Sequence, residues 1–250
     1  MNYHWSWGVF LDEAPDGVNS YLGTILLGTG WTLALSLCAW VISLVIGSGL
    51  GIARTSRSSV WRIFAATPVE IFRNIPLIVQ MFLWYFVLPE VLPAGLGAAI
   101  KHMQQPWSSF VPALLCLGCY GSARVAEHVR AGIQALPPGQ FQAGIALGLT
   151  RAQCYRYVIL PRAFRIILPP LTSEFTATVK YSSVALTIGL LELTGEARAM
   201  QEFSFHIFEA FSAATLIYLV INNVVQLGMH KLERHLALSP RDASRPLLAE

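Results

Sequence analysis

The sequence predicts an all-α polytopic membrane protein with five transmembrane helices. Of the 250 residues, 54% are hydrophobic and only 12% are charged, far from the average of soluble domains. Several long stretches lack Asp, Glu, Lys and Arg altogether. The basic residues gather in alternate connections between those stretches. Together these three observations place the chain in a bilayer.

The five expected helices follow from the stretches that are poor in charge. Residues 17–53, 74–89, 103–123 and 210–229 carry no charged side chain, and 166–191 carry only Glu174 and Lys180. A span needs roughly 20 apolar residues. We therefore expect one helix in each stretch, the second lying near 70–89, within a membrane domain that covers 21–235.

Orientation follows from the basic residues. If the N-terminus lies outside, the inner segments hold thirteen of the seventeen Lys and Arg residues, and the outer segments hold only Lys101 and Arg198. Positive residues favour the cytoplasmic side. We expect a periplasmic segment at 1–20, without the basic start of a cleavable signal, and a cytoplasmic tail at 236–250. The net charge of +3 reflects this asymmetry and does not indicate nucleic acid.

Residues 138–161, PGQFQAGIALGLTRAQCYRYVILP, form a polar elbow between two expected spans on the inner side. The Pro-Pro-Gly run at 137–139 ends one helix, and a short helix follows at 140–147. Gly148 supplies the chain reversal. Thr150 and Gln153 form a capping box for a second helix, which we expect Pro161 to end.

The spacing within this elbow resembles the E-A-A-x3-G-x9-I-x-L-P loop of permease subunits of bacterial ATP-binding-cassette importers. Gln142, Ala143, Gly144 and Gly148 stand at the matching positions, although the family's Glu is Gln142 here and its second Ala is Gly144. The resemblance implies that the loop couples ATP hydrolysis to helix movement. Its contact residues are then Phe141, Gln142, Ala143, Gly144, Gly148 and Leu149.

The resemblance extends over most of the chain, from about 21 to 235. Residues 72–80, FRNIPLIVQ, look like the F-R-x-x-P-L-[LI]-V-Q element of polar amino acid importers. Residues 126–130 and 179–183 are similar to their A-E-x-x-R and K-x-[ST]-S elements. Residues 123–125, 169–174 and 187–190 look closest to glutamate/aspartate permease subunits. The fold implied is that of a type I importer permease.

This resemblance also implies partners. They are a second permease subunit, which we expect to be a paralogue, two ATP-binding subunits and a periplasmic amino acid-binding protein. The chain has no phosphate-binding, hydrolase or zinc-protease motif, so we expect no enzymatic activity, no metal and no cofactor of its own. ATP and magnesium belong to the partner ATPase. The expected location is the bacterial inner membrane.

Charged residues within the spans are candidates for the translocation path, because a charge in the bilayer is costly unless it faces a cavity or a partner. Arg124 and Glu127 lie on the third span. Lys180 shares a polar stripe with Thr172, Thr176, Ser183 and Thr187, and packing against a neighbouring helix explains the stripe equally well.

Arg124 is the sharpest of these candidates, because similar permeases carry an aromatic residue there. A guanidinium can hold a carboxylate bidentately, which suits glutamate or aspartate. Two alternatives are that Arg124 neutralises Glu127 one turn away or extends toward the inner surface. A glutamine or basic amino acid importer, and an ATPase-independent carrier or channel, are the alternative functions.

Two further motifs predict packing. Cys116 and Cys119 form a C-x-x-C without a second pair, inside an apolar span, and small-residue packing explains them better than metal or redox chemistry. Gly47-x3-Gly51 near the end of the first span predicts a close helix contact.

Overall fold

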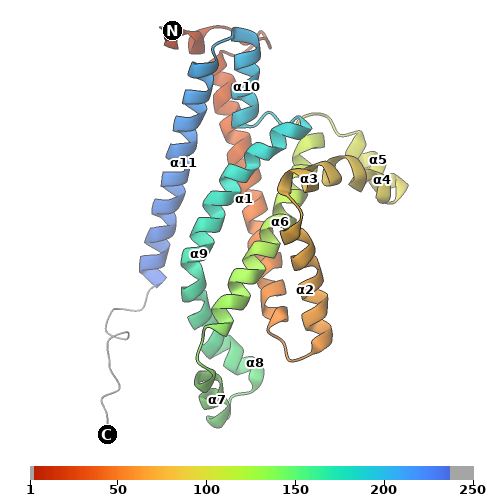
Figure 1. Ribbon diagram of the computed structural model, residues 1–250, viewed down its shortest axis with the longest axis vertical. Helices are drawn as coiled ribbons and strands as arrows, with labels where there is room; N and C mark the ends of the chain where they lie inside the picture. Colours follow the sequence, from red (N-terminus) through yellow and green to blue (C-terminus); the bar gives the residue numbers. More distant parts are fainter. Residues whose placement is uncertain (1–2, 237–250) are drawn as a thin grey trace.

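The computed structural model describes residues 3–236 as a bundle of helices (Figure 1). In chain order these are η1 (Trp7–Leu11), α1 (Tyr21–Arg54), α2 (Ser59–Asn74), α3 (Leu77–Phe82), η2 (Leu83–Val87), α4 (Leu88–Val91), α5 (Ala94–Lys101), α6 (Trp107–Gln134), α7 (Pro138–Ala146), α8 (Arg151–Cys154), η3 (Tyr155–Ile159), α9 (Leu160–Tyr181), η4 (Ser182–Ile188), α10 (Leu193–Ser204) and α11 (Ile207–Leu236). The tail expected at 236–250 lies, except for its first residue, outside the described residues.

Long helices form the body of the bundle. In Figure 1, α1, α6, α9 and α11 run along its length, and α7 and α8 lie at the end opposite to the N-terminus. Three helices, α1, α6 and α11, are long and apolar enough to cross a membrane, and α2 with α3–α4 makes a fourth if that bent pair counts as one span. Helix α9 is not among these helices; it carries four charged residues, Arg162, Arg165, Glu174 and Lys180. The described helices thus do not by themselves establish five spans.

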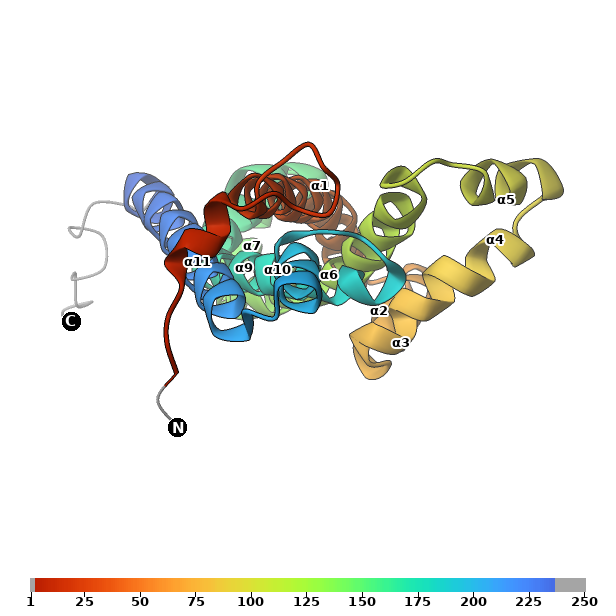
Figure 2. The same cartoon turned by 90° about the horizontal axis from the view of Figure 1, so that it is seen from above.

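The helix expected near 70–89 is not continuous. The chain bends by 106° between α2 and α3, because Ile75 precedes Pro76 and adopts an extended backbone conformation. Gln80 secures the bend, since its Nε2 donates to the carbonyls of Phe72 and Ile75 at 2.8 Å each. The 72–80 sequence element therefore builds a bend. Helices α3 to α5 project to one side of the bundle (Figure 2).

Helix α1 packs closely on α6 through small residues. A Cβ at Gly47 would lie 2.6 Å from the Ser122 carbonyl oxygen, and one at Gly51 would lie 2.6 Å from Val129 Cβ. The predicted close contact of Gly47-x3-Gly51 is confirmed. Ser43 Oγ also donates across this interface to the Gly118 carbonyl at 3.2 Å. Small residues bring the two backbones close enough for such contacts.

Two buried glutamates hold the end of the bundle that carries the N-terminus. Glu192 caps α10 through the Gly195 amide at 2.9 Å and accepts from Tyr218 of α11 at 2.9 Å. Glu209, at the start of α11, accepts from the hydroxyl of Tyr3 and from the Ser6 amide, the latter at 2.7 Å. The N-terminal segment is therefore attached to α11.

Candidate functional site

The first half of the elbow at 138–161 is a short helix, α7, as expected. Gly148 has φ +84°, in the left-handed region. Around it the amide of Leu149 donates to the Gly144 carbonyl at 3.1 Å, and the amide of Gly148 donates to the Ile145 carbonyl at 3.0 Å. These two bonds close a Schellman motif, which ends α7. The predicted chain reversal at Gly148 is confirmed.

The second half of the elbow begins as predicted and ends differently. The capping box is present: Thr150 Oγ1 accepts from the Gln153 amide, and the Gln153 side chain accepts from the Thr150 amide. Pro161, however, does not end the helix, because it lies in the first turn of α9. The π-helix η3 precedes it, and the Leu160 amide donates to the Tyr155 carbonyl. This wider turn accommodates a proline that would otherwise break the helix.

The side chains of α7 divide between an inner and an outer face. Gly144 is buried, and a Cβ there would lie 2.7 Å from Cys154 Sγ. Phe141 turns inward onto Tyr155, with ring centroids 5.9 Å apart. Gln142, Ala143 and Gly148 are exposed, and Leu149 is half-buried. Gly144 and Phe141 therefore hold α7 against the rest of the elbow, while Gln142 and Ala143 remain available to a partner.

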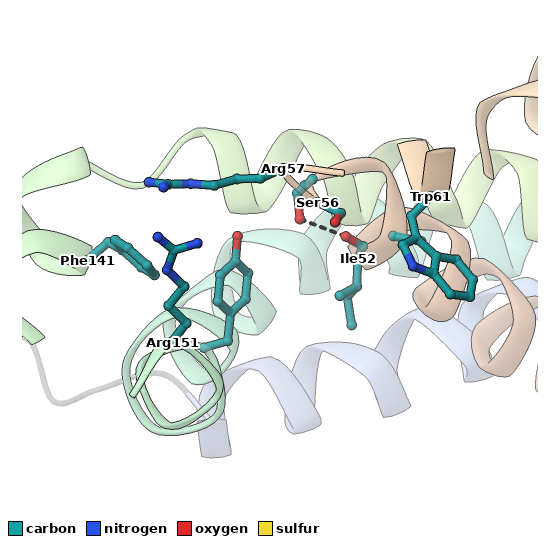
Figure 3. A pocket seen from close by; sticks show the side chains of 9 residues that line it. Ile52, Ser56, Arg57, Trp61, Phe141 and Arg151 are labelled. Carbon is teal, nitrogen blue, oxygen red and sulfur yellow. Dashed lines mark hydrogen bonds between the residues drawn. The ribbon is translucent and has the colours of Figure 1, made fainter. Parts of the chain in front are cut away.

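A basic groove of about 550 Å³ lies between the elbow and the α1–α2 connection (Figure 3). It is lined by Ile52, Ala53, Thr55, Ser56, Arg57, Trp61, Phe141, Arg151 and Tyr155. Arg57 comes from the connection and Arg151 from the start of α8. The groove therefore joins two segments that are about 90 residues apart in the sequence.

Glu127 lies at the centre of an ionic network that joins three helices. Arg54 of α1 approaches it at 2.8 Å, Arg73 of α2 at 3.4 Å, and Arg130 donates from Nε at 2.9 Å. Arg54 also reaches Glu70 at 3.2 Å. Glu70 and Arg73, three residues apart on α2, lie farther from each other, at 4.0 Å. Glu127 therefore binds α1, α2 and α6 together.

Arg124 has a different partner from the one considered in the sequence. Its Nε donates to Glu174 of α9, and within residues 3–236 no hydrogen bond or ion pair joins it to Glu127. The Glu174 side chain is only 5% exposed and also lies 3.5 Å from His128 Nε2. Arg124 itself is 38% exposed and lies over the ring of Tyr120, 5.7 Å from its centroid. The alternative that Arg124 neutralises Glu127 is wrong.

The polar stripe that contains Lys180 is divided by the structure. Thr172 donates to Glu233 of α11 at 2.6 Å, and Thr176 is buried and donates to a carbonyl of its own helix. In this part of the stripe, Thr172 therefore contacts a neighbouring helix and Thr176 bonds to its own helix. Lys180 and Ser183 line a groove of about 340 Å³ with residues of α10 and α11. Because η4 replaces α-helix from Ser182, the expected helical spacing does not continue past this point.

The arrangement of these candidates can be compared with known proteins. Residues 43–238 match the family described as the binding-protein-dependent transport system inner membrane component. The chain belongs to this family. The permease is thus a multi-pass protein of the inner membrane and a transport component rather than an enzyme, as its relatives are. Family membership also implies ATP-hydrolysing and substrate-binding partners in general.

Several characterised permeases are similar to this one over most of their length. The glutamate/aspartate import permease protein GltJ of Escherichia coli K12 is 46% identical over 95% of this chain and 97% of its own. The arginine transport system permease protein ArgU of Corynebacterium glutamicum is 34% identical, covering 88% and 71%. The glutamine transport system permease protein GlnP of Escherichia coli K12 is 31% identical, covering 86% and 93%. The permease is therefore an amino acid importer subunit.

Solved structures agree with the fold. An amino acid ABC transporter structure matches with a TM-score of 0.74 and 32% identity, over 86% of this permease and 95% of that chain. The MetNI methionine ABC transporter matches with a TM-score of 0.71 at 19% identity, over 86% and 97%, which supports the fold alone. The permease thus has the all-helical type I importer architecture.

Sequence reasoning missed the partners that join one helix to another. Glu174 appeared in the sequence only as a charge in the fourth span, and Arg54 only as part of an inner basic segment. One signal could have paired Arg124 with Glu174: opposite charges at similar depth on two antiparallel spans favour each other in a medium of low dielectric constant. Arg124, Glu127 and Lys180 lie in three separate environments.

Proposed function

We propose that this permease is one half of the membrane path of an ATP-driven importer that carries glutamate and aspartate across the inner membrane. The observation that carries the substrate assignment is the state of Arg124. Within residues 3–236 only its Nε donates to Glu174, so both terminal nitrogens of the guanidinium can hold a carboxylate. The similarity to GltJ exceeds that to the glutamine and arginine permeases and supports an acidic substrate.

Glu174 has a positioning role in this proposal. It is buried on α9 and holds Arg124 from one side, with Tyr120 beneath the guanidinium. Tyr181 meets Tyr120 edge to face, with centroids 5.6 Å apart. The aromatic rings restrict the arginine side chain, which lowers the entropy lost when a carboxylate binds. Thr176, Lys180, Ser183 and Glu127 are further candidates for the path, and Glu127 has the weakest claim because arginines already surround it.

Five spans and an outside N-terminus belong to the same proposal. Helix α9 serves as the additional span, with Glu174 neutralised by Arg124 and with Ile167, Leu168 and Leu171 buried around its two central prolines. The N-terminal segment and α10 lie at one end of the bundle and the elbow at the other (Figure 1). If the elbow is cytoplasmic, the basic residues also follow the positive-inside rule.

The elbow is the proposed contact with the ATP-binding subunits, which supply ATP and magnesium chemistry. Gln142 and Ala143 stand on the outer face of α7, and Ile145 is 41% exposed beside them. Such a short helix with small and apolar residues can seat in a groove of a partner. A second permease, which we take to be a paralogue, two ATP-binding subunits and a periplasmic amino acid-binding protein complete the importer.

Replacing Arg124 with Lys tests the substrate assignment. Lysine retains a positive charge for Glu174 but loses the planar pair of donors. We expect the KM for glutamate uptake to rise about tenfold or more, consistent with the loss of one charge-assisted bond, while the yield of the assembled complex stays the same. The measurement is uptake of radiolabelled glutamate into proteoliposomes.

Arg198→Lys is the matched control, because Arg198 pairs on the surface with Glu202 at 2.8 Å and should not affect uptake. Unchanged glutamate uptake in Arg124→Lys would remove Arg124 from the substrate site. If glutamine stimulates ATP hydrolysis by the complex, and glutamate and aspartate do not, the proposal of an acidic substrate is wrong.

A further inference from the structure

The basic groove carries positive charge that no acidic side chain within residues 3–236 neutralises. Arg57 and Arg151 enter it from two different segments, and Figure 3 shows their guanidinium groups on the same side of the groove, next to Phe141. Neither arginine forms an ion pair with any residue of the described range. The lining residues of the groove include no Asp or Glu. Two unneutralised cations in one concave surface favour an anionic ligand.

The groove continues into an apolar surface. Trp61 lines the groove and is 60% exposed, and its ring meets Phe64 edge to face at 6.3 Å. Val60, Ile63 and Phe64, which are 65 to 73% exposed, extend this surface along the first half of α2. Tryptophan prefers the boundary between headgroups and acyl chains. The ligand thus faces cations on one side and a hydrophobic helix on the other.

We propose that the basic groove binds the phosphate headgroup of an anionic phospholipid of the cytoplasmic leaflet, whose acyl chains lie along α2 at Trp61 and Phe64. Basic pockets between helices on the cytoplasmic side are known to hold such headgroups. This assignment rests on the proposed function only in placing the elbow on the cytoplasmic side. The apolar surface next to the groove favours a lipid over soluble phosphate, because soluble phosphate has no acyl chains to cover the exposed apolar side chains of α2.

The bound headgroup has a structural consequence. Arg57 belongs to the α1–α2 connection and Arg151 to the elbow, and one phosphate group can accept from both guanidinium groups. The lipid therefore bridges α1–α2 and the elbow that contacts the ATPase. Since Phe141 and Tyr155 line the same groove, a headgroup there restricts the position of α7.

The test measures lipid binding directly. The full-length permease, purified in mild detergent together with its ATP-binding subunits, is titrated with phosphatidylglycerol or phosphatidylcholine, and native mass spectrometry counts both the retained lipid and the retained subunits. We compare the native chain with Arg57→Gln/Arg151→Gln and with Lys231→Gln/Arg234→Gln, which removes two exposed charges from the end of α11. We expect the first double variant alone to weaken phosphatidylglycerol binding about tenfold or more, since each cation near an anionic lipid contributes on the order of a fivefold gain.

Three results would overturn the assignment. The first is equal retention of phosphatidylglycerol by both double variants, or no preference over phosphatidylcholine. The second is displacement of the lipid by millimolar inorganic phosphate, which would assign the groove to a soluble ligand. The third is loss of the ATP-binding subunits from Arg57→Gln/Arg151→Gln with lipid retention intact, which would assign it to the ATPase interface. Because no arm uses an amino acid substrate, failure of glutamate transport would leave this result standing.

Discussion

Individual charged residues decide how the helices of this permease fit together. Arg124 and Glu127 are three residues apart on α6, yet the first pairs with α9 and the second with α1 and α2. A buried charge without a partner costs several kcal/mol, so each pair fixes the rotation of its helix relative to a neighbour. Glu127 is surrounded by arginines, whereas Arg124 keeps donors for a further carboxylate. For this reason Arg124, rather than Glu127, is the proposed contact for the substrate carboxylate.

Glu196 is a titratable residue outside the spans. Burial on α10 raises its pKa to about 7, against an ordinary value of 4.5, and the nearby carboxylates Asp16 and Glu192 act in the same direction. A Cβ at Gly28 of α1 would lie 2.7 Å from Glu196 Cγ, so α10 and α1 leave the side chain little room. The folded protein therefore favours the protonated acid.

The pKa of Glu196 predicts how stability changes with pH. Since the folded pKa lies above the unfolded value, the folded state binds the proton more tightly, and stability falls as pH rises from about 4.5 to about 7. Glu196→Gln mimics the protonated acid. We expect this variant to have a higher Tm than the native protein at pH 8 and nearly the same Tm at pH 4.5.

Thermal unfolding of the purified permease across this range provides the measurement. The difference in Tm between the variant and the native protein isolates the effect of Glu196, because Glu192 and His206 are present in both proteins. Asp16 contributes at lower pH, because hydrogen bonds from Asn19 and Val18 lower its pKa. Parallel Tm curves for the two proteins would show that Glu196 is not held in its protonated form.

At the scale of elements, the shape of the elbow depends on the capping signals at the ends of its short helices. α7 begins at Pro138 and ends at a Schellman motif, and α8 begins at a capping box. Each of these signals uses residues within five positions of one another, and Phe141 and Leu149 also pack against a buried cluster that includes Val129 and Ile133 of α6. Local signals and tertiary packing together keep the elbow's shape. The proposed role of α7, the transmission of force from the ATP-binding subunits to the membrane helices, requires such stiffness.

Gly148→Val tests that stiffness. Gly148 has φ +84°, and no atom lies within 4 Å of the position that a Cβ would take, so the change meets no steric neighbour and acts through the backbone alone. A β-branched residue in the left-handed region costs about 1–2 kcal/mol. We expect the variant to insert into the membrane normally but to lose most of its amino acid-stimulated ATP hydrolysis.

Gly139→Val is the matched control, because Gly139 lies in the same short helix, also has free space and has no positive φ. Both variants are assembled with the partner subunits, and ATP hydrolysis is measured in proteoliposomes. If the two variants hydrolyse ATP equally, the left-handed backbone at Gly148 is not needed for coupling.

At the scale of the whole molecule, the surface indicates an incomplete assembly. The span in α11 is only 17% buried and that in α1 is 33% buried, against 67% for α6. Large apolar side chains are exposed along α1, α2 and α11. Lipid covers part of this surface, and we expect a second permease to cover the rest.

We expect the permease to co-purify with a second permease and with two copies of an ATP-binding subunit. Affinity capture of the tagged chain from native membranes, followed by mass measurement of the intact complex, provides the test. Capture from membranes that lack the partner genes is the control. A monomer that transports glutamate by itself in liposomes would contradict this assembly.

Much of this protein was determined by the sequence alone. The all-helical class, the positions of α1, α6 and α11, the left-handed Gly148, the capping box at Thr150 and the close approach at Gly47 and Gly51 all follow from it. Each depends on composition, on charge-free length or on residues a few positions apart. The helix lengths and turn signals act within one segment, so the sequence pattern contains them. The small residues Gly47 and Gly51 indicate a close helix contact, although the sequence does not say that the partner is α6.

Only the tertiary structure decided the remaining features. The 106° bend at Pro76, the continuation of α9 through Pro161, the pairing of Arg124 with Glu174 and the division of the Lys180 stripe were not predicted. A proline can end, bend or begin a helix, and a charge in a bilayer can pair with any opposite charge at its depth. Which outcome occurs depends on the helices packed beside it, and that packing is set by the whole chain.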